Sequence, residues 1–309
     1  MNLNHLEYFK VLAETQHMSK ASEKLGISQP SLSYAIKKLE DELQVPLFEP
    51  DGRNIKLTII GKKYYGYISD SLKSLDYGNK VVEQLKNPNT GHINLGFTYT
   101  LGQKLVPDIM TSFLNVPGNS EVSFSLIQDN SYNLLESLYH DELDMILASK
   151  VELRMARHSD EIFDFIPLVQ QEIKLAVPKD HPLYSKKTIS LNDLDGEDLI
   201  TFSKHSGLNS LIKKILNQTK AKPNIKYELE EDHSIIGFVE HNMGIALVPN
   251  LPQLKQDKMA LRSIEDNHLE HNLYLIISRN HFSPPSVHRF QNFALKYCLK
   301  NYINKNTML

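Results

Sequence analysis

The chain has 309 residues, 41% of them hydrophobic and 23% charged, a formal net charge of -3, and a single cysteine, Cys298. This length predicts about two domains, each large enough to bury its own core. No apolar run approaches the roughly 20 residues that a membrane span requires, and one cysteine excludes an internal disulfide framework. The amphipathic start carries acids and is not a signal peptide, so we expect a cytoplasmic protein with no membrane partner.

We expect an amphipathic helix near the N-terminus. It should pack on the two short helices that follow it, which are joined by a tight turn. The turn lies in the stretch MSKASEKLGISQPSLSYAIKKLEDE, residues 18–42. We expect Ser19 to cap the first of these two helices and Gly26 to take the positive φ of the turn. Ser28 is expected to cap the second helix, with Pro30 in its first turn. An apolar stripe follows at Leu32, Ile36, Leu39 and Leu43.

The opposite face of the second helix carries short, mostly polar groups that suit base edges and phosphates in a DNA major groove. The candidate DNA-contacting residues here are Ser28, Gln29, Pro30, Ser31, Ser33, Tyr34, Lys37 and Lys38. The alternative is a solvated face on an ordinary helical hairpin, because such hairpins are common. Acids and bases nearly cancel within residues 1–60, so any DNA contact depends on local placement of charge.

Two short extended runs then flank the turn signal Pro50-Asp51-Gly52 and predict a small β-hairpin, or wing. Arg53 and Lys56 on this hairpin are placed to contact the DNA backbone or a minor groove. From about residue 60 to 85, apolar side chains at steps of three and four predict one long helix. Such a helix buries its stripe against a second copy of the chain, or else against its own chain.

From His92 onward the pattern changes to alternating strands and helices, which predicts an α/β region with mainly parallel sheets. The expected strands include 93–97, 122–126, 145–148, 175–177, 199–202, 225–229, 245–248 and 273–277. The expected helices are 101–114, 132–140, 208–217, 235–242 and 286–302.

The run ASEKLGISQPSLSYAIKKLEDELQVPLF, followed by GRNIKLT and Gly61, closely resembles the N-terminal domain of LysR-type transcriptional regulators. The similarity covers the whole chain and is sharpest over about residues 3–66. It implies a winged helix-turn-helix domain at 1–59, a linker and dimerisation helix at 60–90, and an effector-binding domain at 91–309. In this family an arginine usually follows the Leu-Phe-Glu of the wing, whereas Pro50 stands here, which leaves Arg53 a larger share of that contact.

The resemblance further implies that the effector domain has two α/β lobes, like a periplasmic binding protein. Lobe one would span 91–162 and 268–309, and lobe two 163–267, with crossing strands near 163–168 and 262–267. The implied partners are double-stranded DNA, a small-molecule effector, a second copy through the linker helix, a homotetramer, and RNA polymerase.

Two segments place hydroxyl groups between a strand and a helix, one in each implied lobe. Helix N-termini that face one space favour an anionic ligand, so we expect a small, carboxylate-like effector. The candidate effector-binding residues are Thr98, Tyr99, Thr100, Gln128, Thr201, Phe202, Ser203, His205, Ser206 and His233. The alternative is that Thr100 and Ser206 only cap helices.

Motifs for catalysis and metal binding are missing from the sequence. His268 and His271 form an H-x-x-H without a third ligand at suitable spacing, and no G-x-S-x-G, P-loop or G-x-G-x-x-G occurs. We therefore expect no enzyme, no metal and no cofactor. The alternative function is a cytosolic solute-binding protein built on the α/β region, which leaves residues 1–85 without a role.

Overall fold

A computed structural model describes residues 2–52, 54–87, 89–151, 159–250, 258–279 and 283–303. The chain divides into two compact units, Met1–Lys86 and Asn87–Leu309. Within the described ranges, no helix is both long enough and apolar enough to cross a membrane.

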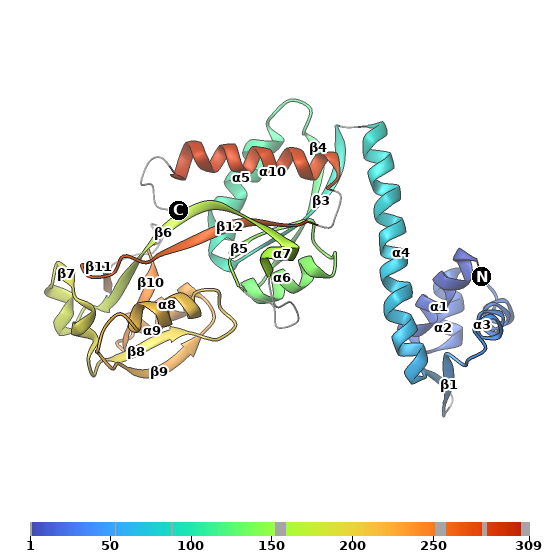
Figure 1. The fold of residues 1–309 in the computed structure, drawn as a ribbon, viewed down its shortest axis with the longest axis horizontal. Helices are drawn as coiled ribbons and strands as arrows, with labels where there is room; N and C mark the ends of the chain where they lie inside the picture. The colour runs from blue at the N-terminus through green and yellow to red at the C-terminus, as the bar shows by residue number, and fades with distance from the viewer. Residues whose placement is uncertain are drawn as a thin grey trace. The chain divides into compact units, whose positions relative to one another are not determined.

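The first unit combines helices with a two-stranded hairpin (Figure 1). Its described elements are α1 (Leu3–Thr15), α2 (Met18–Leu25), α3 (Gln29–Leu43), β1 (Phe48–Asp51), β2 (Asn54–Leu57) and α4 (Ile59–Lys86). Phe9, Leu12, Leu32 and Leu39 are fully buried where α1 and α3 meet. Each such side chain stabilises the fold by about 1.5–3 kcal/mol, so the predicted apolar stripe of α3 is the main contribution of that helix to the core.

The turn between α2 and α3 has the predicted form. Gly26 has a φ of 65°, and the Ser28 hydroxyl accepts a hydrogen bond from the Ser31 backbone N–H at 3.3 Å. The predicted cap of α2 is wrong, because α2 begins at Met18 and is capped by His17. His17 has the extended backbone that a cap requires, whereas the Ser19 hydroxyl, inside the helix, lies 3.4 Å from the Gln29 side-chain oxygen.

The wing hairpin is tied to the helices on both sides of it. Glu40 of α3 accepts a hydrogen bond from the Leu47 backbone N–H at 2.7 Å. Thr58 caps α4 by accepting from the Gly61 backbone N–H at 2.9 Å, while its own N–H donates to the Leu47 carbonyl. A Cβ at position 61 would lie 2.1 Å from that carbonyl oxygen, so only glycine fits there.

The long helix α4 changes character along its length. Near its start, Ile68 is buried and the Tyr64 ring lies 5.4 Å from the Phe9 ring, so this end packs on its own unit. Farther along, Leu75 is 52% exposed and Leu85 is 61% exposed. Packing within the first unit therefore covers only the first part of the predicted stripe.

The second unit is α/β, as predicted, and its strands join in the path β4-β3-β5-β12-β6-β10-β8-β9. Its described strands are β3 (Thr90–Phe97), β4 (Glu121–Gln128), β5 (Met145–Ser149), β6 (Phe163–Pro178), β7 (Thr188–Ile189), β8 (Asp198–Phe202), β9 (Asn224–Leu229), β10 (Ile245–Pro249), β11 (Met259–Ile264) and β12 (Glu270–Ser278). Its described helices are η1 (Tyr99–Gln103), α5 (Leu105–Leu114), α6 (Ser131–Tyr139), α7 (Ser159–Ile162), η2 (Pro182–Ser185), η3 (Leu191–Leu194), α8 (Asn209–Leu216), α9 (Asp232–Glu240), α10 (Pro285–Cys298) and the π-helical η4 (Leu299–Ile303). Each predicted strand and helix overlaps one or more of these elements.

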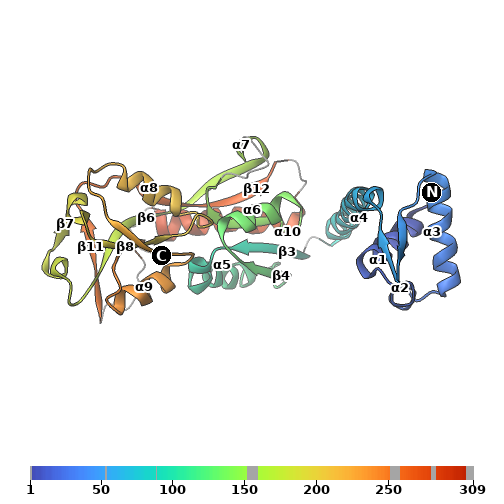
Figure 2. The ribbon, with the colours of Figure 1, turned by 90° about the horizontal axis from the view of Figure 1, so that it is seen from below.

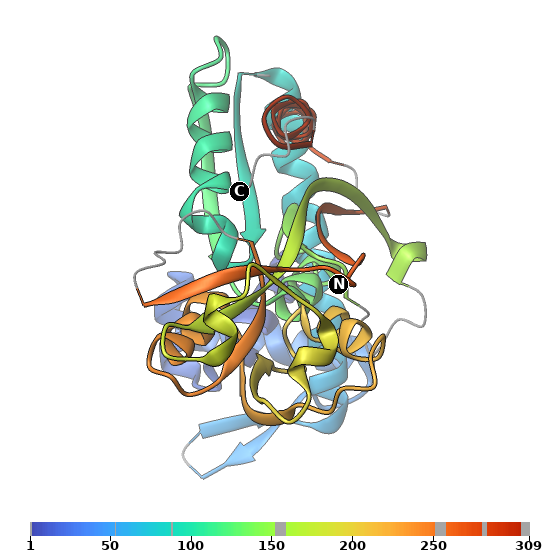
Figure 3. The ribbon, with the colours of Figure 1, turned by 90° about the vertical axis from the view of Figure 1, so that its left-hand side faces the viewer.

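The strands form two lobes, each with a parallel group at its centre. In lobe one, β3 pairs in parallel with β4 and β5, and in lobe two β8 pairs in parallel with β9 and β10. Helix α10, seen end on in dark red in Figure 3, packs with α5 on the lobe-one sheet, and α6 covers the other face. Antiparallel pairs occur where β6 and β12 join the lobes, so the sheets are mixed rather than mainly parallel.

Strands β6 and β12 run side by side between the lobes (Figure 2). From Phe163 to Glu172, β6 pairs with β12, and from Ile173 to Pro178 it pairs with β10 or β11. The change of sheet therefore falls between Glu172 and Ile173, beyond the predicted range 163–168. The cause is the length of β6, which has buried side chains in the cores of both lobes.

Candidate functional sites

The structure places the predicted DNA-contacting residues of α3 on one open surface. The buried positions of this helix are Leu32, Ala35, Ile36 and Leu39, which leaves the opposite face free. We call that face, with the preceding cap, the α3 face, and all its members are exposed: Ser28, Gln29, Pro30, Ser31, Ser33, Tyr34, Lys37 and Lys38. Tyr34 is 68% exposed, so its ring is open to contact by a partner.

The wing carries less free positive charge than its sequence indicates. Lys56 is exposed on β2, but its ammonium lies 3.5 Å from the Glu49 carboxylate and 3.7 Å from that of Asp51. Glu49 is the direct cross-strand neighbour of Lys56, so the hairpin register creates this pairing. Arg53, the other predicted wing contact, lies outside the described residues.

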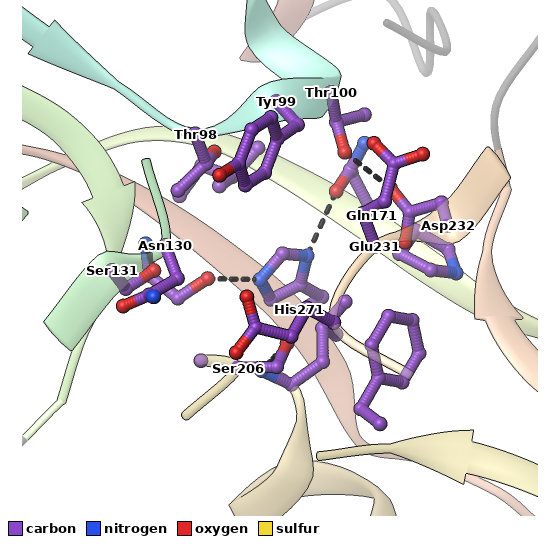
Figure 4. A pocket seen from close by; sticks show the side chains of 17 residues that line it. Thr98, Tyr99, Thr100, Asn130, Ser131, Gln171, Ser206, Glu231, Asp232 and His271 are labelled. Carbon is purple, nitrogen blue, oxygen red and sulfur yellow. Dashed lines mark hydrogen bonds between the residues drawn. The ribbon is translucent and has the colours of Figure 1, made fainter. Parts of the chain in front are cut away.

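A small pocket lies between the lobes, beside the crossing strands (Figure 4). Five of the predicted effector-binding residues line it: Thr98, Tyr99, Thr100, Phe202 and Ser206. Its volume is about 40 Å³, well below the roughly 300–1,000 Å³ that is common for ligand sites. The lobes are thus closed against each other around this space.

The remaining predicted residues lie elsewhere. Gln128 is exposed and donates to the Tyr99 carbonyl at 3.2 Å, while Thr201 is buried in β8. The Ser203 hydroxyl is buried without a partner among the described residues but does not line the pocket. His205 lines a neighbouring groove, and His233 lies 3.0 Å from the Gln103 amide nitrogen of lobe one.

Sequence reasoning missed several residues of the pocket, among them Asn130, Ser131, Ser149, Gln171, Glu230, Glu231, Asp232 and His271. A signal existed for some of them, because Ser149 ends a strand and Asn130 caps a helix, as the predicted residues do. Gln171 and His271 gave no such signal. They lie opposite each other on β6 and β12 only because those strands cross between the lobes in that register.

His271 is the centre of a buried hydrogen-bond chain. Its Nε2 lies 2.7 Å from the Ser149 hydroxyl, and its Nδ1 lies 2.8 Å from Oε1 of Gln171. Burial lowers the pKa of His271 to about 4, so the ring is neutral at pH 7. Because a carbonyl oxygen can only accept, Nδ1 carries the proton and Nε2 accepts from Ser149.

Two direct contacts close the pocket from lobe to lobe. Thr100 of η1 donates to Oδ2 of Asp232 at the start of α9, and Gln103 contacts His233 one residue later. Asp232 is 2% exposed. Desolvation, partly offset by the Thr100 hydrogen bond and the nearby His233, raises the pKa of Asp232 to about 6.

Two polar atoms of this pocket are buried with no partner among the described residues. They are Nε2 of Gln171, a donor, and Oδ1 of Asp232, an acceptor. Leaving such groups unpaired costs about 1–3 kcal/mol each. The pocket therefore holds an unmet donor and an unmet acceptor, which a bound polar molecule would satisfy.

A larger groove of about 530 Å³ adjoins the pocket and shares Ser149, Ser206 and His271 with it. Three lysines, Lys150, Lys204 and Lys214, line this lysine groove. Lys150 pairs with Asp160 at 2.6 Å, whereas the other two have no ion pair within the described ranges. Among all the residues that the structure describes, no group of three or more His, Cys, Asp or Glu residues could hold a metal ion.

Comparison with known proteins decides the family. Residues 3–62 match the bacterial regulatory helix-turn-helix protein family of lysR type, and residues 86–299 match the LysR substrate binding domain. The chain belongs to the LysR family of transcriptional regulators. It is thus a DNA-binding regulator with a substrate-binding effector domain, and not an enzyme.

Relatives and solved structures agree with this assignment. The HTH-type transcriptional regulator YybE of Bacillus subtilis (strain 168) is 33% identical over 297 residues, which covers 96% of this chain and 99% of YybE. The effector binding domain of QuiR, solved in complex with shikimate, is 30% identical with a TM-score of 0.65, covering 69% of this chain and all of that one. A full-length OxyR variant from Pseudomonas aeruginosa has the same fold, with a TM-score of 0.66 at 21% identity over 96% of this chain and 98% of that one.

Proposed function

We propose that this LysR-type regulator, acting in the cytoplasm, binds a small carboxylate in the interlobe pocket and that occupancy changes DNA binding by the α3 face. The observation that carries the proposal is the unpaired Nε2 of Gln171, a buried donor on the strand that joins the lobes. A carboxylate oxygen is the acceptor that such a donor lacks.

Three further features favour a negatively charged ligand group near the N-termini of α6 and α8. The N-terminus of α6 opens at Asn130 and Ser131, and α8 starts at Asn209 with no side-chain cap. Helix N-termini attract anions through their free N–H groups. The two unpaired lysines of the adjoining groove add positive charge on the same side. The shikimate in the QuiR complex is itself a carboxylate, which supports this ligand class.

The ligand would act by changing how the lobes fit together. The closed pocket, with a volume of about 40 Å³, is too small for a molecule such as shikimate. Binding therefore requires the lobes to part or shift about β6 and β12. The contacts from Thr100 to Asp232 and from Gln103 to His233 would then rearrange. A ligand shifts such an equilibrium only by its difference in affinity for the two arrangements.

Assembly would carry this shift to DNA. The exposed apolar residues on the far part of α4 would form a surface for a second copy of the chain, and pairing there would place two α3 faces on successive major grooves. By family resemblance, effector domains would pair further to a homotetramer, and the bound complex would contact RNA polymerase.

Footprinting tests the proposal. The full-length protein is incubated with DNA from upstream of its own gene, alone and with shikimate or each of a panel of small carboxylates. The matched variants are Gln171→Leu and Gln170→Leu, because Gln170 is the exposed neighbour on the same strand. We expect a two-fold-related protected site that one carboxylate alters, with the response lost only in Gln171→Leu. If no carboxylate alters protection or raises the melting temperature, the proposal is wrong.

A further inference from the structure

The charge of the interlobe pocket is uneven, and this narrows the ligand class. Glu230, Glu231 and Asp232 line the pocket at the start of α9, and no described lysine or arginine lines it. His271, which also lines the pocket, is neutral at pH 7 because burial lowers its pKa to about 4. One side of the pocket therefore has three carboxylates without a cation to balance them.

Asp232 shows most clearly that a partner is missing. It is 2% exposed and lines the pocket, and Thr100 satisfies only its Oδ2, so Oδ1 is left with no donor in the described structure. A buried carboxylate without a cation is costly, which its raised pKa reflects. A hydroxyl could supply one hydrogen bond to Oδ1, but only a positive group would also balance the charge of Glu231 and Asp232.

The two unmet atoms belong to side chains that line the same small pocket. In the view of Figure 4, Gln171 lies between His271 and the Thr100–Asp232 pair. Asn130 and Ser131 lie on the other side of His271 in this view. A small molecule that carries both an acceptor group and a donor group would supply a partner to Gln171 and to Asp232.

We propose that the effector is a free α-amino acid. Its carboxylate would accept from Nε2 of Gln171 and face the α6 end of the pocket, and its ammonium would donate to Oδ1 of Asp232 beside Glu231. The side chain would extend toward the lysine groove, which has the volume for it. This inference rests on the proposed function and adds the positive group to the carboxylate.

The test measures binding of each of the twenty common L-amino acids to the full-length protein, by thermal shift and then calorimetry at pH 7.5. The matched 2-hydroxy acids, such as L-lactate for L-alanine and L-malate for L-aspartate, have a hydroxyl in place of the ammonium. The variant is Asp232→Asn, which keeps the shape and the Thr100 contact while removing the charge. Glu228→Gln is the control, because this exposed carboxylate on β9 does not line the pocket.

We expect one amino acid to bind the wild type at least tenfold more tightly than its 2-hydroxy acid. Asp232→Asn should weaken amino-acid binding at least tenfold and narrow that difference, while Glu228→Gln changes neither. Binding of shikimate or another amine-free carboxylate that is lost in Gln171→Leu but unchanged in Asp232→Asn would overturn the amino-acid inference and leave the carboxylate pocket standing. Failure of every amino acid and every carboxylate to bind would overturn both.

Discussion

The α3 face and the interlobe pocket expose their polar groups in opposite ways. The α3 face is one side of a single helix whose other side is in the core, so its polar groups meet solvent and are satisfied by water. The pocket gathers side chains from the ends of many elements, and its Gln171 and Asp232 are buried with unmet atoms. The first surface is ready for a large, hydrated partner, and the second is incomplete without a small one.

This difference also separates what stabilises each region. The α3 face can be altered without disturbing the core, because its residues contribute little to packing. The pocket residues Asp232 and His271 are buried, and their shifted pKa values make the folding free energy depend on pH. Changes in the pocket should therefore alter stability and ligand response together, while changes on the α3 face alter DNA binding alone.

The largest expected effect is a loss of stability in the first unit, with no change in the stability of the second. Gly61→Ala places a Cβ 2.1 Å from the Leu47 carbonyl oxygen, so the wing must separate from α4. We expect a loss of about 3 kcal/mol or more for the first unit, because overpacking against backbone has no cheap relief. Differential scanning calorimetry should show one transition falling while that of the effector domain stays.

Gly66→Ala is the matched control on the same helix, since no described atom beyond the chain neighbours and the helix's own backbone lies within 4 Å of the added Cβ. It should stabilise the first unit by up to about 1 kcal/mol through helix propensity. Equal melting temperatures of the first unit in Gly61→Ala and Gly66→Ala would contradict the close approach of Gly61 to the Leu47 carbonyl oxygen.

The next effect concerns the pocket and depends on pH. The pKa of Asp232 rises from 3.8 to about 6 on folding, so its contribution to stability is present below pH 3.8 and lost as pH rises through 6. The pKa of His271 falls from 6.5 to about 4, so its contribution is present above pH 6.5 and lost as pH falls through 4. Each amounts to about 3 kcal/mol, and in the wild type the two oppose each other between pH 4 and 6.5.

Substitution separates these two contributions. As the pH falls from 6.5 to 4, the Asp232→Asn variant should lose stability more steeply than the wild type. Over the same range, the stability of the His271→Gln variant should rise relative to the wild type. Urea unfolding at several pH values measures this, with Glu231 and His233 as the other titratable groups beside Asp232. Parallel pH profiles for the two variants would show that the burial of these groups is not as described.

On the α3 face, the expected effects are on recognition and not on stability. Ser33→Ala and Tyr34→Ala should change sequence preference, at about 1–3 kcal/mol for a lost base contact. Lys37→Ala should weaken binding to all sequences and reduce the slope of log affinity against log salt by about one. Selection from random DNA and salt titration measure these, and unchanged binding in all three would move the contact surface elsewhere.

The smallest effect is expected in the wing. Lys56 forms ion pairs with Glu49 and Asp51. The Lys56→Ala substitution should therefore change the slope of log affinity against log salt less than Lys37→Ala does. The loss of DNA affinity should be under about 1 kcal/mol. A larger effect than that of Lys37→Ala would mean that DNA displaces both acids from Lys56.

The two regions also differ in how far the sequence predicts them. Gly26, Ser28 and Pro30 define the hairpin turn through local backbone rules, so the α3 face follows from spacing along one helix. Thr98 to Thr100 and Ser206 were found because strand ends and helix starts have a local pattern. Gln171 and His271 were not found, because their meeting depends on the register of two strands 100 residues apart in the chain.

The central claim is that the pocket and the α3 face are coupled through one chain. Linkage requires that a ligand which changes DNA affinity be bound with an affinity that DNA changes by the same factor. The most direct measurement is therefore calorimetry of the full-length protein with the ligand found by footprinting, alone and saturated with its DNA site. We predict a shift in the ligand Kd equal to the shift in DNA affinity. An identical Kd with and without DNA would contradict the account.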